Sequence, residues 1–246
     1  MICGIIPSRY ASTRFPGKPL TDLGGKTMIQ RVYEQALQCP ALDELWVATD
    51  DARIYDHVLS FGGKAVMTAA HHCNGTERCA EVAATRLADS DVVINIQGDE
   101  PFIDPLQIAE LISCFQHQET ELATLIKEIT RAELLFNPNV PKVVVGTHGQ
   151  ALYFSRAALP YQRDRKQEDW LQHHNYYKHI GIYGYRAGVL QSLVKLGPTP
   201  LELSESLEQL RWLEHGYRIQ TKTTAFETLS IDTPEDLEAA LKRCTP

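Results

Sequence analysis

The sequence predicts an α/β fold with a mostly parallel central sheet flanked by helices. Short apolar runs alternate with amphipathic segments through the first half of the chain, which is the pattern of consecutive β/α units. The chain has 246 residues, of which 43% are hydrophobic, so it can bury a sizeable core. No internal repeat or low-complexity segment interrupts the pattern. These observations together favour a single α/β domain.

In the first half of the chain, strands and helices are expected in alternation. The predicted strands are Ile2 to Pro7, Leu45 to Ala48, Lys64 to Met67 and Val92 to Ile96. The predicted helices are Met28 to Gln38, Arg53 to Phe61, Glu77 to Leu87 and Leu106 to Gln116. Asp104 is a suitable N-cap for the last of these helices, with Pro105 at its first position.

The second half of the chain shows a different pattern. Strand-like segments follow one another without long helices between them, which predicts an antiparallel extension within residues 120–160. These segments are Leu122 to Glu128, Lys142 to Val145 and Ala151 to Phe154. After a polar stretch expected to be flexible, Gln162 to His174, come a strand, a helix, a strand and a closing helix. They are predicted at Tyr177 to Tyr185, Ser206 to His215, Arg218 to Lys222 and Pro234 to Arg243. We therefore expect residues 1–246 to form one domain carrying that extension.

Composition excludes several classes of protein. A net charge of −7 argues against broad binding to nucleic acid or to a membrane surface. The first residues lack the basic start and apolar run of a signal peptide, and no stretch approaches the roughly 18 apolar residues of a membrane span. The six cysteines show no spacing typical of a disulfide framework or a zinc site. We expect a cytoplasmic protein with reduced thiols.

A basic loop follows the first predicted strand and carries Arg9, Arg14 and Lys18. A loop at the carboxyl edge of a parallel sheet offers backbone N–H groups, and its cations can neutralise a triphosphate. The spacing fits neither a Walker loop nor a dinucleotide-binding turn. From these residues alone, a solvated basic loop is an equal alternative.

Two aspartates are candidate metal ligands. Asp99 follows the strand at Val92 to Ile96, so its carboxylate is expected at the same sheet edge as the basic loop. Thr233 and Asp236 make a good helix start, which leaves Asp232 just outside the helix. Both could hold Mg²⁺, which prefers oxygen ligands. The alternatives are a turn aspartate at Asp99 and an aspartate favoured by the helix dipole at Asp232.

Seven motifs, taken in order, resemble those of the CMP-Kdo synthetases, the 3-deoxy-manno-octulosonate (Kdo) cytidylyltransferases. They are Ile6 to Leu20, Val47 to Asp50, Asn74 to Arg78, Asn95 to Pro101, His179 to Arg186, Leu207 to Arg211 and Asp232 to Asp236. The resemblance covers nearly the whole chain. It implies a Rossmann-like fold of the nucleotide-diphospho-sugar transferase type. It also implies Mg²⁺-dependent transfer of CMP from CTP to the 2-hydroxyl of Kdo, with release of diphosphate, for lipopolysaccharide biosynthesis. It implies a homodimer as well, and we place the contact at the antiparallel segment Leu122 to Phe154.

The resemblance also implies residue roles. The catalytic residues would be Arg14, Lys18, Asp99 and Asp232, and the two aspartates would bind the metal. The nucleotide-binding residues would be Arg9, Arg14, Lys18, Asn74, Gly75, Thr76, Arg78 and Gln97. The sugar-binding residues would be Arg163, His179, Tyr183, Glu208 and Gln209. Local reasoning leaves other roles open: Thr76 could cap the following helix, and His179 and Tyr183 could be core residues.

Some features depart from the family pattern or suggest other readings. Ala69 stands where some relatives place Arg, and Asn74 where Ser is common, which weakens the case for a nucleotide contact from either side chain. His71, His72, Cys73 and Cys79 suggest zinc, but they do not form two separated short-spaced pairs. Two rival functions remain: a cytidylyltransferase for 8-amino-Kdo or another acid sugar, and a noncatalytic sugar-nucleotide-binding protein.

Overall fold

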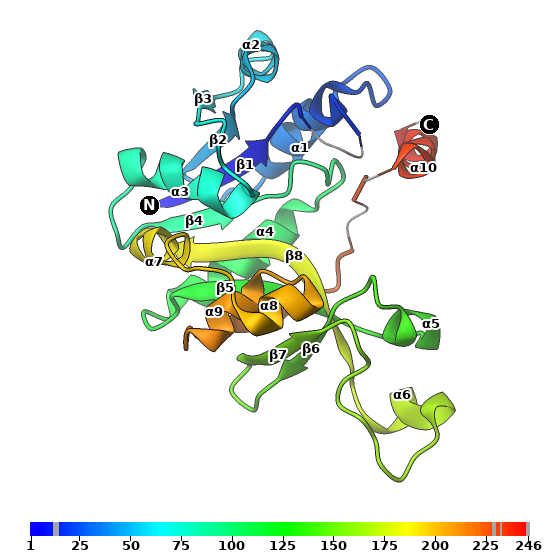
Figure 1. The fold of residues 1–246 in the computed structure, drawn as a ribbon. Coiled ribbons are helices and arrows are strands. Elements are labelled where there is room, and N and C mark those ends of the chain that lie inside the picture. Colours follow the sequence, from blue (N-terminus) through cyan, green and yellow to red (C-terminus); the bar gives the residue numbers. More distant parts are fainter. Residues whose placement is uncertain (12–14, 228–229, 232, 245–246) are drawn as a thin grey trace.

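Within residues 1–11, 15–227, 230–231 and 233–244, which the computed structural model describes, nine strands form one sheet. The strands are β1 (Ile2–Ser8), β2 (Glu44–Thr49), β3 (Ala65–Met67), β4 (Val92–Asn95), β5 (Leu122–Glu128), β6 (Lys142–Val145), β7 (Ala151–Ser155), β8 (Tyr177–Arg186) and β9 (Gln220–Thr223). Their main order is β3-β2-β1-β4-β8-β5-β9 (Figure 1). The first four run parallel, and β8 lies antiparallel to both β4 and β5. The mostly parallel sheet predicted from the sequence is therefore present.

Helices cover both faces of the sheet (Figure 1). They are α1 (Met28–Leu37), α2 (Ala52–Ser60), α3 (Gly75–Arg86), α4 (Pro105–Ser113), α5 (Ala132–Phe136), α6 (Trp170–His173), α7 (Ala187–Leu193), α8 (Pro200–Glu205), α9 (Gln209–Glu214) and α10 (Pro234–Cys244). One core packs α1, α2 and α4 on one face, and a second packs α3, α7 and α9 on the other. Full burial of each aliphatic side chain contributes about 1.5–3 kcal/mol, so these cores hold the strands in register and position the loops that follow.

Local capping signals place several helices as predicted. The side chain of Asp104 accepts a hydrogen bond from Leu106 N at the start of α4, with Pro105 at the first position. Thr233 and Asp236 bond each other's backbone N–H groups at the start of α10. The first turn of α3 differs from the expectation. Asn74, not Thr76, is the N-cap, and it accepts from Glu77 N at 2.8 Å.

The second half of the chain departs more from the predictions. The segment from Leu122 to Phe154 divides: β5 lies inside the main sheet between β8 and β9, while β6 and β7 form a hairpin beside β8. The start of β7 also lies beside the start of β9, because Ala151 N donates at 2.8 Å to the carbonyl of Ile219, the residue before β9. The predicted helix from Ser206 to His215 is shorter, since Ser206 has φ 51° and ends α8. The helices α5, α7 and α8 were not predicted.

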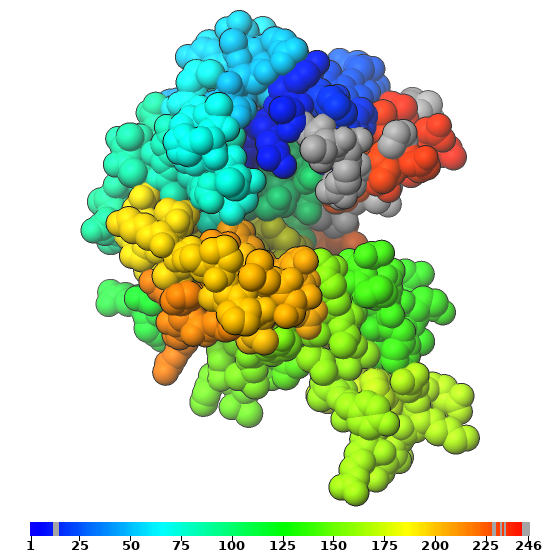
Figure 2. All heavy atoms as spheres, viewed as in Figure 1, coloured from blue at the N-terminus to red at the C-terminus, as the bar shows by residue number. Residues whose placement is uncertain are grey.

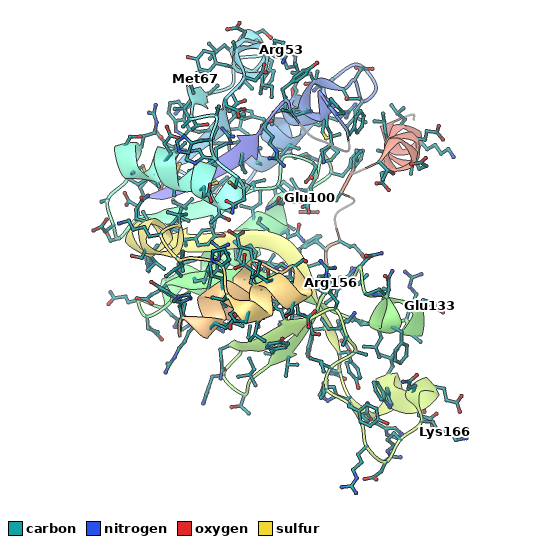
Figure 3. The ribbon with its side chains drawn as sticks, viewed as in Figure 1. Arg53, Met67, Glu100, Glu133, Arg156 and Lys166 are labelled. Carbon is teal, nitrogen blue, oxygen red and sulfur yellow. The ribbon has the colours of Figure 1, made fainter. Side chains whose placement is uncertain are left out.

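The polar segment from Gln162 to His174 contains more structure than expected. It forms a short 3-10 helix (Gln167–Asp169) followed by α6. Trp170 anchors it, because this side chain is 1% exposed and packs in a small core with Ile129, Leu135 and Tyr176. A single buried tryptophan therefore orders a stretch whose composition indicated a flexible loop. Figure 3 shows Lys166 at the far tip of this arm.

Candidate functional site

A cavity of about 240 Å³ lies at the carboxyl edge of the parallel strands. Its lining residues come from the end of β1 and the loop after it, from the loop after β4, and from the segment that joins β3 to α3 with the start of that helix. They meet because parallel strands deliver their following loops to one edge. They are Pro7, Ser8, Arg9, Lys18, His72, Asn74, Gly75, Arg78, Gln97, Gly98 and Asp99. Figure 2 shows the molecular surface hollowed between the blue and cyan upper part and the orange and green lower part.

Close backbone packing shapes the floor of this cavity. A Cβ on Gly75 would lie 2.9 Å from Pro7 Cγ, and one on Gly98 would lie 2.9 Å from Pro7 O. Both distances are shorter than real Cβ contacts, so only glycine lets the start of α3 and the loop after β4 approach the end of β1 this closely. The hydroxyl of Ser8, buried beside them, has no hydrogen-bond partner among the described residues.

The basic loop brings Lys18 to Asp99. Gly17, just before Lys18, has φ 74°, and its N–H donates to Tyr10 O at 3.0 Å, which closes the loop. Lys18 Nζ then lies 2.8 Å from Asp99 Oδ2 and 2.8 Å from Ile231 O. Arg9 also lines the cavity. Arg14 lies outside the described residues, so its predicted role is not addressed by the structure.

The C-terminal chain returns to this point. Ile231 N donates to Asp99 O at 3.0 Å, so the residue directly before Asp232 is hydrogen-bonded to the backbone of Asp99. Asp232 itself lies outside the described residues. Of the two aspartates predicted as metal ligands, Asp99 is therefore the one that lies within the described residues.

The start of α3 is linked to Glu208 at the start of α9. Asn74 Nδ2 donates to Glu208 Oε1 at 2.9 Å, and Thr76 Oγ1 donates to Oε2 at 3.0 Å. Burial raises the pKa of Glu208, and the hydrogen bond from Thr76 opposes that shift. Because each carboxylate oxygen accepts one of these hydrogen bonds, Glu208 ties the start of α3, on the nucleotide side, to the start of α9, which carries the sugar-side candidate Gln209. Sequence reasoning did not foresee this link.

The other sugar-side candidates gather on one face of β8 and on α9. The ring of His179 packs edge-on against Phe154 and lies 3.1 Å from Thr124 Oγ1 through Nε2. Burial lowers the pKa of His179 to about 4, so the ring is neutral at pH 7. Burial, with a smaller contribution from Glu208, raises the pKa of Tyr183 well above its usual value. Gln209 is 5% exposed, and its amide nitrogen has no partner among the described residues.

Three other predicted contacts have different surroundings. Arg78 lines the cavity, but its guanidinium donates to Thr68 Oγ1 at 2.5 Å and to Asp50 Oδ2 at 3.1 Å. Gln97 donates to Gly181 O at 3.0 Å, which ties the loop after β4 to β8. Arg163 is exposed on the arm that ends in α6, and it does not line the cavity. Thr76 is also outside this lining, as are the other sugar-side candidates: His179, Tyr183, Glu208 and Gln209. The cavity therefore brings together these predicted residues: Arg9, Lys18, Asn74, Gly75, Arg78, Gln97 and Asp99.

The main residue that sequence reasoning missed is His72, which lines the cavity. It was considered only as part of a possible zinc cluster. Its position directly before the predicted nucleotide segment was the signal that could have identified it.

Comparison with known proteins identifies the family. The model of the cytidylyltransferase family matches residues 3–241. The 3-deoxy-manno-octulosonate cytidylyltransferase of Parabacteroides distasonis is 54% identical over 242 residues, covering 97% of this chain and 96% of that protein. That of Bacteroides thetaiotaomicron is 55% identical over 240 residues, covering 96% and 95%. The chain belongs to the 3-deoxy-manno-octulosonate cytidylyltransferase family.

Solved structures agree with this assignment. A CMP:2-keto-3-deoxy-manno-octonic acid synthetase complexed with CTP superposes with a TM-score of 0.91 at 44% identity, covering 98% of this chain and 97% of that one. A 4-diphosphocytidyl-2C-methyl-D-erythritol synthase of Anaerococcus prevotii, 11% identical with a TM-score of 0.63, shares the fold. The predicted family and fold class of this cytidylyltransferase family member are both confirmed. No helix in the described part of the chain is long and apolar enough to cross a membrane.

Proposed function

We propose that this chain transfers CMP from CTP to Kdo and releases diphosphate. The observation that carries the proposal is the set of groups around one cavity: Arg9, Lys18, Asp99 and the N-terminus of α3. Cations and helix N–H groups suit a polyphosphate, while a carboxylate suits a hard cation. The choice of Kdo and CTP as substrates follows the names of the relatives given above, and the solved relative was complexed with CTP.

The reaction needs charge stabilisation rather than a covalent intermediate. The 2-hydroxyl oxygen of Kdo attacks the α-phosphorus of CTP. The new P–O bond forms as the bond to diphosphate breaks, and the hydroxyl proton passes to solvent water. Negative charge grows on the departing diphosphate, so Lys18 and Arg9 stabilise it from the cavity wall. Arg14 is assigned to the same phosphates on the sequence motif alone.

Asp99 fits a magnesium ligand. Its carboxylate is 27% exposed at the cavity and already accepts one cation, the ammonium of Lys18. Carboxylate oxygen is the donor type that Mg²⁺ prefers, and Asp232 would supply a second such group. When bound, Mg²⁺ would neutralise the phosphates and make the sugar hydroxyl more acidic.

The sugar side offers hydrogen-bonding groups rather than charges. The buried amide nitrogen of Gln209 can donate to a hydroxyl or a carboxylate of the sugar. His179, neutral at pH 7, can both donate and accept. Glu208 contributes mainly by orienting Asn74 and Thr76, because both of its oxygens are already bonded. Burying such groups around a ligand favours a substrate that satisfies all of them.

We also propose that the chain acts as a homodimer through the β6–β7 hairpin. Among the described strands, β7 pairs with β6 alone, and beyond Ala151, whose N–H donates to Ile219 O, its other edge is open to another chain. Leu152 on this strand is 54% exposed and lines a wide depression of about 970 Å³ with Tyr217. Analytical ultracentrifugation of the wild type and of Leu152→Glu tests the assignment. A dimer that survives in the variant would contradict it.

Diphosphate release tests the function directly. CTP and Kdo are incubated with the protein, with and without Mg²⁺, and 8-amino-Kdo and other acid sugars replace Kdo in parallel. Release that requires CTP, Kdo and Mg²⁺ together supports the proposal. Preference for another acid sugar would change the substrate, and no release with any of them would overturn the enzymatic function.

A further inference from the structure

The segment 69–74 walls one side of the nucleotide cavity through His72 and Asn74. It has no regular secondary structure of its own, so something else must fix its backbone. The fixing groups come from α3, which follows directly. Glu77 and Glu81 are four residues apart on this helix and therefore lie on the same side of it.

Each of these carboxylates holds one backbone N–H of the segment. Glu81 Oε2 accepts from Ala69 N at 2.9 Å, and Glu77 Oε2 accepts from Cys73 N at 2.8 Å. Burial alone would raise the pKa of Glu81, but the hydrogen bonds from Ala69 N and His72 outweigh it and the net shift is downward. Both ends of the segment are thus tied to the first turns of α3.

His72 closes the arrangement from the middle. Its Nε2 lies 2.5 Å from Glu81 Oε2, and its Nδ1 lies 3.7 Å from Glu77 Oε2. The side chain is 12% exposed and lines the cavity. The ring is thus hydrogen-bonded to Glu81, and the carboxylate of Glu77 lies near its other nitrogen. The adjacent His71 is exposed, and its ring lies 4.8 Å from that of His72.

We propose that His72 is a positioning residue for the nucleotide: with Glu77 and Glu81 it clamps segment 69–74 onto α3 in the shape that receives CTP. The proposal rests on the function proposed above and deepens it. Without the ring, the two glutamates still hold the ends of the segment, but its centre is released from the helix. Asn74, which caps α3 and donates to Glu208, lies at the end of the same segment. Loss of the clamp should therefore weaken CTP binding more than Kdo binding.

Isothermal titration of CTP into His72→Ala, Glu81→Gln and the double variant tests the clamp, with His71→Ala as the matched control. We expect the Kd for CTP to rise about tenfold in His72→Ala, as for loss of a hydrogen bond to a charged group. The double variant should lie within about twofold of the larger single effect, since residues of one network are not additive. In steady-state assays, the KM for CTP should rise while the KM for Kdo stays near that of the wild type.

Further measurements separate positioning from a general loss of fold. Hydrogen exchange of the amides at 69–74 should speed up in His72→Ala, with the strands of the sheet unchanged. His72→Gln, which can still bond one glutamate, should recover part of the affinity. A Kd for His72→Ala within about twofold of that for His71→Ala, or additive effects of His72 and Glu81, would overturn the proposal. If the wild type bound no CTP at all, the proposed function would fail. The hydrogen-exchange rates of the amides at 69–74 would then still show whether His72 holds this segment on α3.

Discussion

Replacement of Lys18 by Met tests the most consequential contact in the site. The Lys18 ammonium lies 2.8 Å from Asp99 Oδ2, on the carboxylate where the proposed metal would bind. A divalent cation that binds Asp99 would compete with this ammonium for the same carboxylate. The same lysine is assigned to the phosphates of CTP under the proposed function, so nucleotide binding would draw it away from Asp99. The proposed roles of Lys18 therefore predict that metal binding and nucleotide binding are coupled.

The size of the effect follows from the exposure of the pair. The two side chains are 14% and 27% exposed, so water screens their attraction only in part. A hydrogen bond to a charged group contributes about 1.5–3 kcal/mol, and each 1.4 kcal/mol is about tenfold in affinity. Lys18→Met should therefore bind Mn²⁺, in the absence of nucleotide, about tenfold to about 140-fold more tightly than the wild type does.

Electron paramagnetic resonance of free Mn²⁺ measures this affinity without any need for activity. Lys26→Met is the matched control, because Lys26 pairs with Glu34 on the exposed surface of the protein. Coupling is reciprocal, so Mn²⁺ should tighten CTP binding to the wild type. Equal Mn²⁺ affinity in Lys18→Met and the wild type, measured without CTP, would refute the reasoning.

Three other predictions concern turnover, substrate affinity and pH. Asp99→Asn should retain a normal circular dichroism spectrum and lose most turnover, since one electrostatic contact at a reacting centre is commonly worth about 2.7–4 kcal/mol; a rate within about threefold of the wild type would remove Asp99 from the site. His179→Ala should raise the KM for Kdo alone. Glu208→Ala should raise the KM for both substrates, because Glu208 also holds Asn74. A change in the KM for CTP alone, in either variant, would contradict these roles. The pKa of His179 is lowered to about 4, so between pH 6.5 and 4 the unfolded chain binds more protons than the folded chain, and stability is lost as pH falls through this window. The difference between the urea unfolding midpoints at pH 7 and pH 5 should therefore be smaller in His179→Gln than in the wild type. An equal difference in both proteins would argue against a buried neutral ring.

The sequence by itself determined the features that neighbouring residues encode. The alternation of strands and helices up to α4 follows from short-range periodicity, and the caps at Asp104 and Thr233 lie within a few residues of the groups they bond. The nucleotide segment, the basic loop and the placing of Lys18 and Asp99 at one sheet edge also came from local motifs and from the rule that parallel strands end together. The family was recognised from the same motifs.

Only the tertiary structure decided how these pieces meet. Asn74 and Glu208 are 134 residues apart, and Lys18 and Asp99 are 81 apart, so no local pattern could state that their side chains bond. The order of the polar arm around Trp170 and the place of β5 inside the main sheet were also beyond local patterns. Both depend on burial against partners from distant segments. Periodicity and capping are properties of adjacent residues, whereas the hydrogen-bond partners of Glu208 and the neighbours of His72 exist only once the sheet and α3 have packed.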